Sequence, residues 1–406
     1  MTKLIFEGGN ISGDRVTKLW KSLKELSEEY KEILEKASKS SPEKLSEFIQ
    51  KLTEPLKNKQ IVIINGSHLS MLLDDYGYCE LEFPEYCVSW MKYIFQLVRE
   101  SGVPLSLEAS PSSLEELARR GYDDFIEEIR ELAEKGLLEI VNGTYSLPYL
   151  TLIGYESNIM QFAEGLRIFK KLLGTAPKVY LATEFALHPQ LPQILAKLGY
   201  ELAVARARLN GTPPQVDEEA VLWNAPDGSS ITAILQYESV PIGESYSGRF
   251  YLQLPSMISK AAKSKLSLVI FENYEDAIYP VAKFESFAKA WKEGILPVEM
   301  STFQRILGKL KPSQRMFRPS WEEYRMYLLK TPPDLLLKGK LAEHALLAAE
   351  AIQAFASLLG IGIDAVDSLD HLWRQLMRAQ HHDAYVVPYC KQGDYMGSRA
   401  KVYGEY

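Results

Sequence analysis

Hydrophobic positions follow a helical period at the start of the chain and a different pattern from about residue 60. Between residues 14 and 57, Leu and Ile recur every three or four positions among Lys and Glu, which predicts amphipathic helices. The Ser40-Ser41-Pro42 run marks the start of a second helix, because serine and proline are favoured at helix N-termini. We therefore expect residues 1–58 to form a helical hairpin packed on the outside of the main domain.

From residue 60 onward, short apolar, β-rich runs alternate with helical patterns. The predicted strands are 60–64, 104–107, 137–141, 178–181, 201–205, 266–271 and 296–298. The predicted helices between them include 85–100, 122–135, 157–173, 192–198 and 280–292. Alternation of this kind is typical of a parallel sheet, and seven units are close to the number that closes a barrel. The sequence thus predicts a seven-stranded (β/α) barrel-like domain over residues 59–325.

Two segments depart from this alternation. Residues 220–238 read as an antiparallel hairpin with Pro226-Asp227-Gly228 at its turn, inserted after a barrel strand. Beyond Pro332-Pro333 the pattern is purely helical, with helices predicted over 334–359 and 367–380. We place a domain boundary near residues 320–333 and assign residues 326–406 to an α-helical bundle domain.

Charge and composition narrow the classes of partner. The 406 residues carry a net charge of −7 without a basic tract, which argues against binding to nucleic acid or anionic membranes. The three cysteines show no CxxC spacing, and the sequence has neither a secretory leader pattern nor an apolar run of about 20 residues. We expect a cytoplasmic protein that does not depend on disulfides, and its oligomeric state stays open.

Candidate chemistry lies where the predicted strands end. In parallel barrels the functional groups gather at the carboxyl ends of the strands. Polar residues follow most of these ends, although solvated loops would explain any one of them. In chain order they are His68, Glu108, Asn142, Glu184, Glu272, Glu275 and Asp276.

Glu184 is the main candidate for a catalytic nucleophile. It follows an apolar strand and precedes a helix, whose amide dipole would help to keep the carboxylate ionised. A retaining glycosidase needs such a carboxylate together with a second carboxyl of raised pKa. Asp276 is the first candidate for this acid/base, with Glu275 beside it as the alternative. An acid that only stabilises its own helix is the other interpretation of Glu184.

A histidine pair ends the last predicted helix. His381, His382 and Asp383 follow an apolar helical stripe, and the whole chain contains only six histidines. A helix can aim such a pair, so metal ligation and sugar or proton handling are natural interpretations. A polar helix end whose histidines interact only with the helix dipole is the alternative. Together with His68, His382 could form half of a zinc site.

The run Gln380–Ala384, with the helical segment 341–351 and Leu372-Trp373 before it, resembles the helical part of family 38 glycoside hydrolases, the retaining α-mannosidases. The resemblance spans residues 60–384. It implies zinc held by His68 and His382. It also implies sugar hydroxyls held by Asp383, and we expect His381, Glu108 and Asn142 to contact the sugar as well.

Two positions depart from the family 38 pattern. Ser70 and Thr183 occupy places where that family has carboxylate zinc ligands, so the resemblance requires Glu184 and either Asp74 or Asp75 to replace them. The Leu181-Ala182-Thr183-Glu184 run is similar instead to the Trp-Leu-x-Glu motif of family 57 glycoside hydrolases, which act on α-glucans without a metal. Gly136–Gly143 is similar to a stretch found in both families.

We therefore expect a retaining glycoside hydrolase that acts on α-linked sugars and is α-mannosidase-like. One alternative is a family 57-like, metal-independent α-glucan hydrolase or transferase. The other is a noncatalytic carbohydrate-binding relative that has lost the zinc site, which the replacements at Ser70 and Thr183 favour.

Overall fold

The computed structural model describes residues 59–69, 85–181, 188–205, 216–235, 238–239, 254–276, 299–317, 333–362 and 365–382, together with Leu56. Apart from Leu56, the predicted N-terminal hairpin lies outside this part of the chain. So do the helix predicted at 280–292, the strand predicted at 296–298 and the proposed domain boundary at 320–333.

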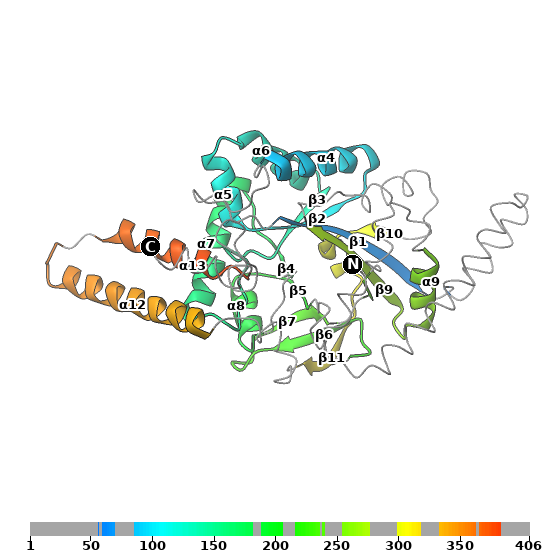
Figure 1. Cartoon of the computed structure of the whole chain (residues 1–406). Helices are drawn as coiled ribbons and strands as arrows, with labels where there is room; N and C mark the ends of the chain where they lie inside the picture. The colour runs from blue at the N-terminus through cyan, green and yellow to red at the C-terminus, as the bar shows by residue number, and fades with distance from the viewer. Residues whose placement is uncertain are drawn as a thin grey trace, which may run out of the picture.

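A curled, mostly parallel sheet of eleven strands forms the centre of the described structure (Figure 1). Its order is β11-β6-β7-β5-β4-β3-β2-β1-β9-β8, and β10 also pairs with β1. The strands are β1 (Gln60–Leu69), β2 (Leu105–Ala109), β3 (Leu138–Val141), β4 (Val179–Leu181), β5 (Leu202–Val204), β6 (Ala220–Asn224), β7 (Ser230–Ile234), β8 (Glu238–Ser239), β9 (Leu268–Asp276), β10 (Glu299–Ser301) and β11 (Pro312–Phe317). The predicted barrel-like fold is thus confirmed.

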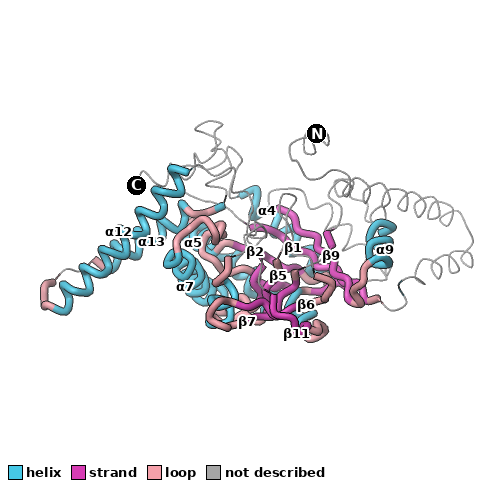
Figure 2. The backbone as a smooth tube through the Cα atoms, turned by 90° about the horizontal axis from the view of Figure 1, so that it is seen from below, coloured by secondary structure: helices cyan, strands magenta, loops and turns pink. Residues whose placement is uncertain are grey.

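Helices cover the outer surface of this sheet (Figure 2). Buried apolar side chains on the outer faces of β1, β2 and β3 pack against helices on one side, and those of β5, β6 and β7 pack against helices on the other. These helices are α4 (Glu85–Ser101), α5 (Pro111–Arg119), α6 (Asp123–Glu134), α7 (Tyr155–Leu173), α8 (Leu191–Lys197) and α9 (Leu254–Lys263). Parallel sheets are stable when covered in this way, because their strands bury apolar residues on both faces.

A separate apolar core fills the inside of the curled sheet. Its strand residues point inward, and the short helix α11 (Phe303–Leu307) contributes Phe303 and Ile306. Glu139 on β3 fixes this helix, because its carboxylate accepts hydrogen bonds from the backbone N–H groups of Phe303 (3.1 Å) and Gln304 (2.6 Å). Burial raises the pKa of Glu139 to about 7, against the opposing effect of these hydrogen bonds.

Two helices project from the body of the molecule as a hairpin, as both Figure 1 and Figure 2 show. They are α12 (Pro333–Leu358) and α13 (Val366–Ala379). Trp373, Leu376 and Met377 of α13 are buried together with Tyr145, which attaches the base of the hairpin to the barrel. Among the described helices, none combines the length and the apolar character that a membrane span requires.

The predicted elements agree with the described structure in kind, and the differences lie at their ends. The antiparallel hairpin is confirmed as β6 and β7, and six predicted strands overlap observed ones. β1, β2 and β9 run further than predicted, so His68, Glu108 and Asp276 lie within strands and not in the loops after them. Ladder pairing to the neighbouring strands holds these polar positions in extended conformation.

The raised pKa of Glu139 predicts that stability changes with pH. Between about pH 4.5, the usual value for Glu, and pH 7 the folded state keeps a proton that the unfolded state has released. The stabilisation is therefore complete below this range and is lost as pH rises through 7, by up to about 3 kcal/mol. Urea unfolding at several pH values should show this fall for the wild type but not for Glu139→Gln. An unchanged fall in that variant would mean that another group titrates.

Candidate functional site

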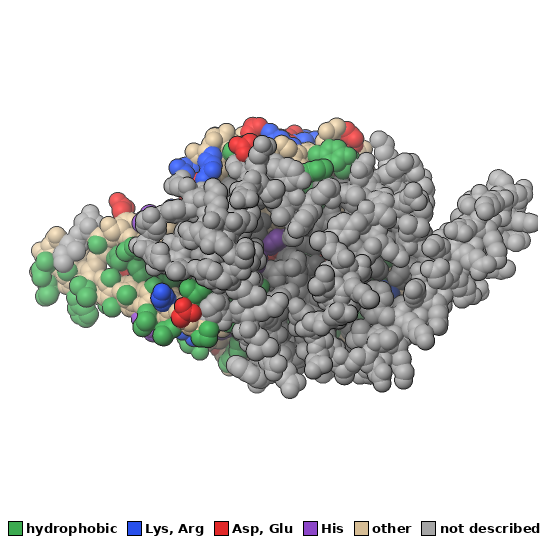
Figure 3. Space-filling model, viewed as in Figure 1, with side chains coloured by type: hydrophobic (Ala, Val, Ile, Leu, Met, Phe, Trp, Pro, Cys, Tyr) green, Lys and Arg blue, Asp and Glu red, His purple; other side chains and the backbone are tan. Residues whose placement is uncertain are grey.

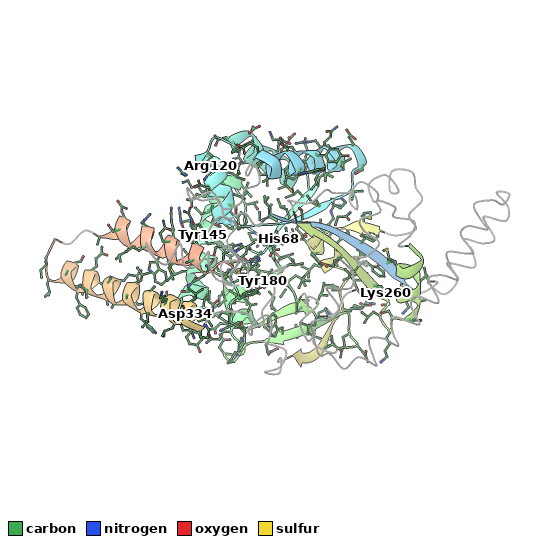
Figure 4. All side chains as sticks on the ribbon, in the orientation of Figure 1. His68, Arg120, Tyr145, Tyr180, Lys260 and Asp334 are labelled. Atoms are coloured by element: carbon green, nitrogen blue, oxygen red, sulfur yellow. The ribbon has the colours of Figure 1, made fainter. Side chains whose placement is uncertain are left out.

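Three buried polar side chains form the centre of the candidate site. His68 Nδ1 lies 2.6 Å from Glu108 Oε2, and Asn142 Nδ2 donates a hydrogen bond of 2.7 Å to Glu108 Oε1. His68 is 8% exposed, and Glu108 and Asn142 are 1% exposed. Glu108 therefore accepts from both neighbours, one at each oxygen. Figure 4 labels His68 near the centre of the molecule, and Figure 3 shows a histidine in a recess at the corresponding place.

Sheet register brings these residues together. His68 on β1 pairs with Glu108 on β2, and Glu108 pairs with Val141 on β3, the residue before Asn142. Residues paired across parallel strands lie on the same face of a sheet, so His68, Glu108 and Val141 belong to the inner face at its carboxyl edge. Asn142 joins this group through the left-handed turn that follows β3. The sequence prediction that polar residues at these strand ends converge is correct for these three.

Asn142 also turns the backbone out of β3. Its φ of 74° lies in the left-handed region, which asparagine adopts more readily than most residues. Its Oδ1 accepts hydrogen bonds from the backbone N–H and the hydroxyl of Thr144, at 3.0 and 2.7 Å. Tyr200 donates to its carbonyl oxygen at 2.6 Å. Both the turn and the direction of the Asn142 amide are thereby fixed.

The loop after Asn142 rests directly on helix α7 at Gly165. A Cβ at this position would overlap the carbonyl oxygen of Gly143 and the backbone nitrogen of Tyr145. Next to this contact, Gln161 Oε1 accepts from the N–H of Ser146 at 2.9 Å, and Gln161 Nε2 donates to Gln380 Oε1 at 3.2 Å. This helix therefore links the loop of the barrel to the far C-terminal segment.

The C-terminal histidines complete the cluster from the other end of the chain. The ring centroid of His382 lies 5.6 Å from that of His68 and 5.7 Å from that of Tyr149. His381 stacks on His382 at 4.1 Å, and its backbone bridges to Pro148. These contacts bring His382 beside His68, the pair that the sequence predicted could form half of a zinc site.

Hydrogen bonds determine how the two imidazoles carry their protons. His382 Nδ1 must donate to the carbonyl oxygen of Leu147, 2.7 Å away, because a carbonyl only accepts. His68 Nδ1 likewise donates to Glu108 when that carboxylate is ionised. In the neutral form of each ring Nε2 is then the basic nitrogen, suited to accept a hydrogen bond from a sugar hydroxyl or to bind a metal.

Register also distinguishes the two candidate acids on β9. The Cα of Asp276 pairs with that of His68, whereas Glu275 pairs with Ser67. Ser67 belongs to the outer face, where its hydroxyl contacts the sulfur of Met91 on α4 at 3.4 Å. Position 276 is therefore on the face of His68, and position 275 is on the opposite face.

Several predicted site residues lie outside the described part of the chain. They are Ser70, Asp74, Asp75, Thr183, Glu184 and Asp383. The described part contains no group of three or more His, Cys, Asp or Glu side chains that could hold a metal. His188 packs against Tyr155 with ring centroids 6.1 Å apart, and burial lowers its pKa.

Sequence reasoning missed the residues that support this cluster. Gln161, Leu147 and Tyr149 contact the C-terminal histidines or Gln380, and the Ser146 hydroxyl donates to the carbonyl oxygen of Met377. None of these four belongs to a recognisable motif. Leu147 has a φ of 54°, which a sequence alone would not suggest for a leucine. Only Gln380 carried a signal, since it is adjacent to the histidine pair.

The fold and cluster define a class of protein, a curled parallel α/β barrel whose polar groups meet at the carboxyl edge of the sheet. Residues 16–207 match the sequence model of Glycosyl hydrolase family 57, which confirms the family 57 resemblance over this part of the chain. No curated protein matches the sequence at a significant level. The likeness to family 38 rests on structural similarity.

Solved structures of carbohydrate-active enzymes share the fold. The 4-alpha-glucanotransferase from Thermococcus litoralis has a TM-score of 0.55 and 16% identity, over 80% of this chain and 54% of that one. An alpha-mannosidase from Enterococcus faecalis has a TM-score of 0.61 and 19% identity, over 86% and 41%. A family 57 branching enzyme from Thermococcus kodakaraensis has a TM-score of 0.55 and 15% identity, over 86% and 89%. The chain thus spans only about half of the first two enzymes.

The substitution Glu108→Gln should weaken this site. Unlike the carboxylate, the amide of glutamine has one accepting oxygen and one donating NH2 group. The NH2 group would therefore face another donor, either His68 Nδ1–H or the Asn142 side-chain NH2, and one of the two hydrogen bonds would be lost. We expect a loss of about 1–3 kcal/mol in unfolding free energy, measured by urea denaturation. NMR of the His68 ring nitrogens should show a changed tautomer or hydrogen bond. The exposed, ion-paired Glu127 provides a matched control, for which Glu127→Gln should cost less than about 0.5 kcal/mol. Equal losses in both variants would contradict the assigned contacts.

Proposed function

We propose that the chain is a family 57-type glycoside hydrolase or transferase that acts on α-linked sugars with retention of configuration. The register of β9 against β1 carries the proposal, because it sets Asp276 opposite the buried His68–Glu108 pair. β4 ends at Leu181, three residues before Glu184. Because parallel strands end at one edge of a sheet, we propose that Glu184 and Asp276 act from the same edge.

In the proposed mechanism Glu184 is the nucleophile and Asp276 is the acid/base. The Glu184 carboxylate attacks the anomeric carbon while the Asp276 carboxyl gives its proton to the leaving oxygen, which forms a covalent glycosyl-enzyme. Asp276 then takes a proton from water, or from an acceptor sugar in a transferase, and this oxygen displaces Glu184. Glu275 is disfavoured as the acid/base, because its register position is on the other face.

The described polar cluster is suited to binding the sugar. His382 and His68 come from two different parts of the chain and lie with ring centroids 5.6 Å apart, while Glu108, itself bonded to Asn142, fixes the His68 ring. We propose that these residues, with His381 and Asp383, position sugar hydroxyls. Buried groups with fixed protons recognise hydroxyls well, since an unmatched ligand would leave them unsatisfied.

We favour an α-glucan over an α-mannoside as the substrate. The match in sequence is to family 57, whereas the likeness to the mannosidase is one of fold at 19% identity. The alternative is a carbohydrate-binding protein without catalytic activity, which would apply if the carboxyls of Glu184 and Asp276 took no part in catalysis. Assays on malto-oligosaccharides and on aryl α-glucosides and α-mannosides distinguish these three possibilities.

Substitutions of the carboxyls test the mechanism. Glu184→Gln should lower kcat/KM by about 10³-fold or more, and Asp276→Asn by about 10²-fold or more on a substrate with a poor leaving group. Glu275→Gln should lower kcat/KM far less than Asp276→Asn does. Azide should rescue Glu184→Ala by forming a glycosyl azide, which a purely structural role would not permit. Wild-type protein that binds these sugars without turnover would support the noncatalytic alternative.

The zinc content of the purified protein distinguishes the zinc-dependent, mannosidase-like alternative from the metal-independent one. His68 and His382 fit a metal site as far as they are described, because ligating histidines usually donate Nδ1–H to a carbonyl or carboxylate. Further ligands would come from Glu184 and Asp74 or Asp75, since Ser70 and Thr183 cannot supply carboxylates. We expect purified protein to carry well below one zinc per chain, and chelators to leave its activity and Tm unchanged. One tightly held equivalent that is lost in His382→Asn would favour the zinc-dependent alternative.

A further inference from the structure

The outer side of α12 presents an unusual amount of apolar surface. Nine of the thirteen exposed large apolar side chains in the described residues belong to the projecting hairpin. They are Leu337, Leu341, Ile352, Phe355, Leu358, Leu359, Ile361, Val366 and Leu372. Hydrophobic atoms accordingly gather along the arm in Figure 3. At roughly 150–200 Å² for each fully exposed side chain, these residues together present on the order of 1,000 Å² of apolar surface, spread over the hairpin.

Part of this surface is an ordered stripe along one side of α12. We call it the α12 stripe, and it comprises Leu341, Ala345, Ala348, Ile352 and Phe355 on α12 and Leu359 in the turn directly after it, all of them exposed. The spacing alternates between four and three residues, the pattern of a coiled-coil seam. At 100° per residue the stripe covers about 80° of the helix circumference. Buried Leu346 lies about 140° around the helix from the centre of the stripe, and buried Ala356 flanks the stripe at about 60°.

Charge is absent from this side of the helix. Between residues 341 and 361 the sequence contains no Lys, Arg or Asp, and its only acids are Glu343 and Glu350. Glu343 is buried and accepts from the hydroxyl of Ser157 at 2.8 Å. Glu350 accepts from the indole N–H of Trp373 at 2.6 Å. Both carboxylates are thus engaged toward the body or α13. A helix that binds a lipid surface normally carries basic residues beside its apolar face, which this segment lacks.

The order of large and small residues in the stripe is self-complementary. If two copies of α12 lie antiparallel with a twofold axis at residue 350, Ile352 meets Ala348 of the second copy and Phe355 meets Ala345. Leu359 then meets Leu341 by the same symmetry. Each bulky side chain of the central layers faces an alanine, which allows the helices to approach closely and interdigitate. The same patch serves both copies, as a twofold interface requires.

We propose that the α12 stripe is a homodimer interface, in which the hairpins of two copies pair antiparallel about residue 350 to form a four-helix arrangement. The four large side chains of the stripe present roughly half of the ~800 Å² that each partner contributes to a stable interface, and neighbouring apolar residues of the hairpin add to this surface. The interface joins the two projecting arms and leaves the histidine cluster at the base of each arm outside it. Dimerisation therefore does not depend on the proposed catalytic function.

Sedimentation velocity of the full chain tests this interface. We expect the wild type to be mainly dimeric at about 10 µM. Phe355→Glu should weaken dimerisation at least tenfold, because aromatic anchors dominate such interfaces. Leu358→Glu is the matched control, since Leu358 is 82% exposed but lies about 100° around the helix from the centre of the stripe and about 60° from Phe355. It should dimerise like the wild type. Circular dichroism and Tm should be unchanged in both variants, because neither side chain packs against the body.

Disulfide trapping tests the direction of pairing. Ala345→Cys chains mixed with Phe355→Cys chains should give a covalent heterodimer under oxidation, while each variant alone should not. Self-crosslinking of each variant would indicate parallel pairing and overturn the register. A monomeric wild type would overturn the interface as a whole. In that case hydrogen exchange of α12 in the presence and absence of residues 383–406, together with binding to anionic vesicles, would identify what covers the stripe.

Discussion

The parallel register of β1 between β2 and β9 is the constraint on which the site depends. It sets His68 beside Glu108 on one side and beside the position of Asp276 on the other. A shift of one residue would move every side chain of the strand to the opposite face. Ile61 would then leave the outer core and Val62 the inner core. The apolar residues on both faces of β1 therefore fix the geometry of the polar residues at its end. The same burial that stabilises the sheet also determines which chemistry can take place at its edge.

A second set of contacts joins the helical hairpin to this framework. Gln161 connects the loop after β3 to Gln380, while Glu343 of α12 accepts the backbone N–H groups of Glu156 and Ser157 at the start of α7. A carboxylate at this end of a helix is favourable because the helix dipole is positive there. Helix α7 is thus held by the hairpin at its beginning and supports the site loop along its side. This arrangement explains how a segment so late in the chain can be positioned accurately at the barrel.

Much of the fold could be predicted from the sequence because burial produces clear patterns. The apolar strands of the parallel sheet and the helices α4, α6, α7, α12 and α13 were recognisable from hydrophobic period and turn residues. Strand ends were predicted too early, since Gly66-Ser67-His68 and Glu272–Asp276 read as loops by composition. Polar residues continue a strand when ladder pairing and a polar interior satisfy them, and the sequence of one strand does not reveal its partners. The helix α5 was missed although Ser110-Pro111 is a recognisable start signal.

The candidate site was predictable in its motif residues and not in its supports. The histidine pair, Glu108 and Asn142 stood out by residue type and position, whereas the roles of Leu147 and Gln161 depend on tertiary contacts between distant segments. The register of β9 against β1 favours position 276 over position 275 for the proposed acid/base, a choice that the sequence alone left open. Alternation along a strand makes neighbouring carboxyls inequivalent once the faces are known.

The hydrogen bond between His382 and Leu147 spans 235 positions of the chain. During synthesis the strands of the sheet leave the ribosome long before His382 does. The nascent chain can therefore bury most of the apolar residues of the sheet before His382 is available to pack beside His68. Closing so long a loop costs entropy, which the apolar contacts of α13 must offset before the ring can dock. The His382 side of the candidate site can therefore form only after α13 has been synthesised, later than the strands that carry His68 and Glu108.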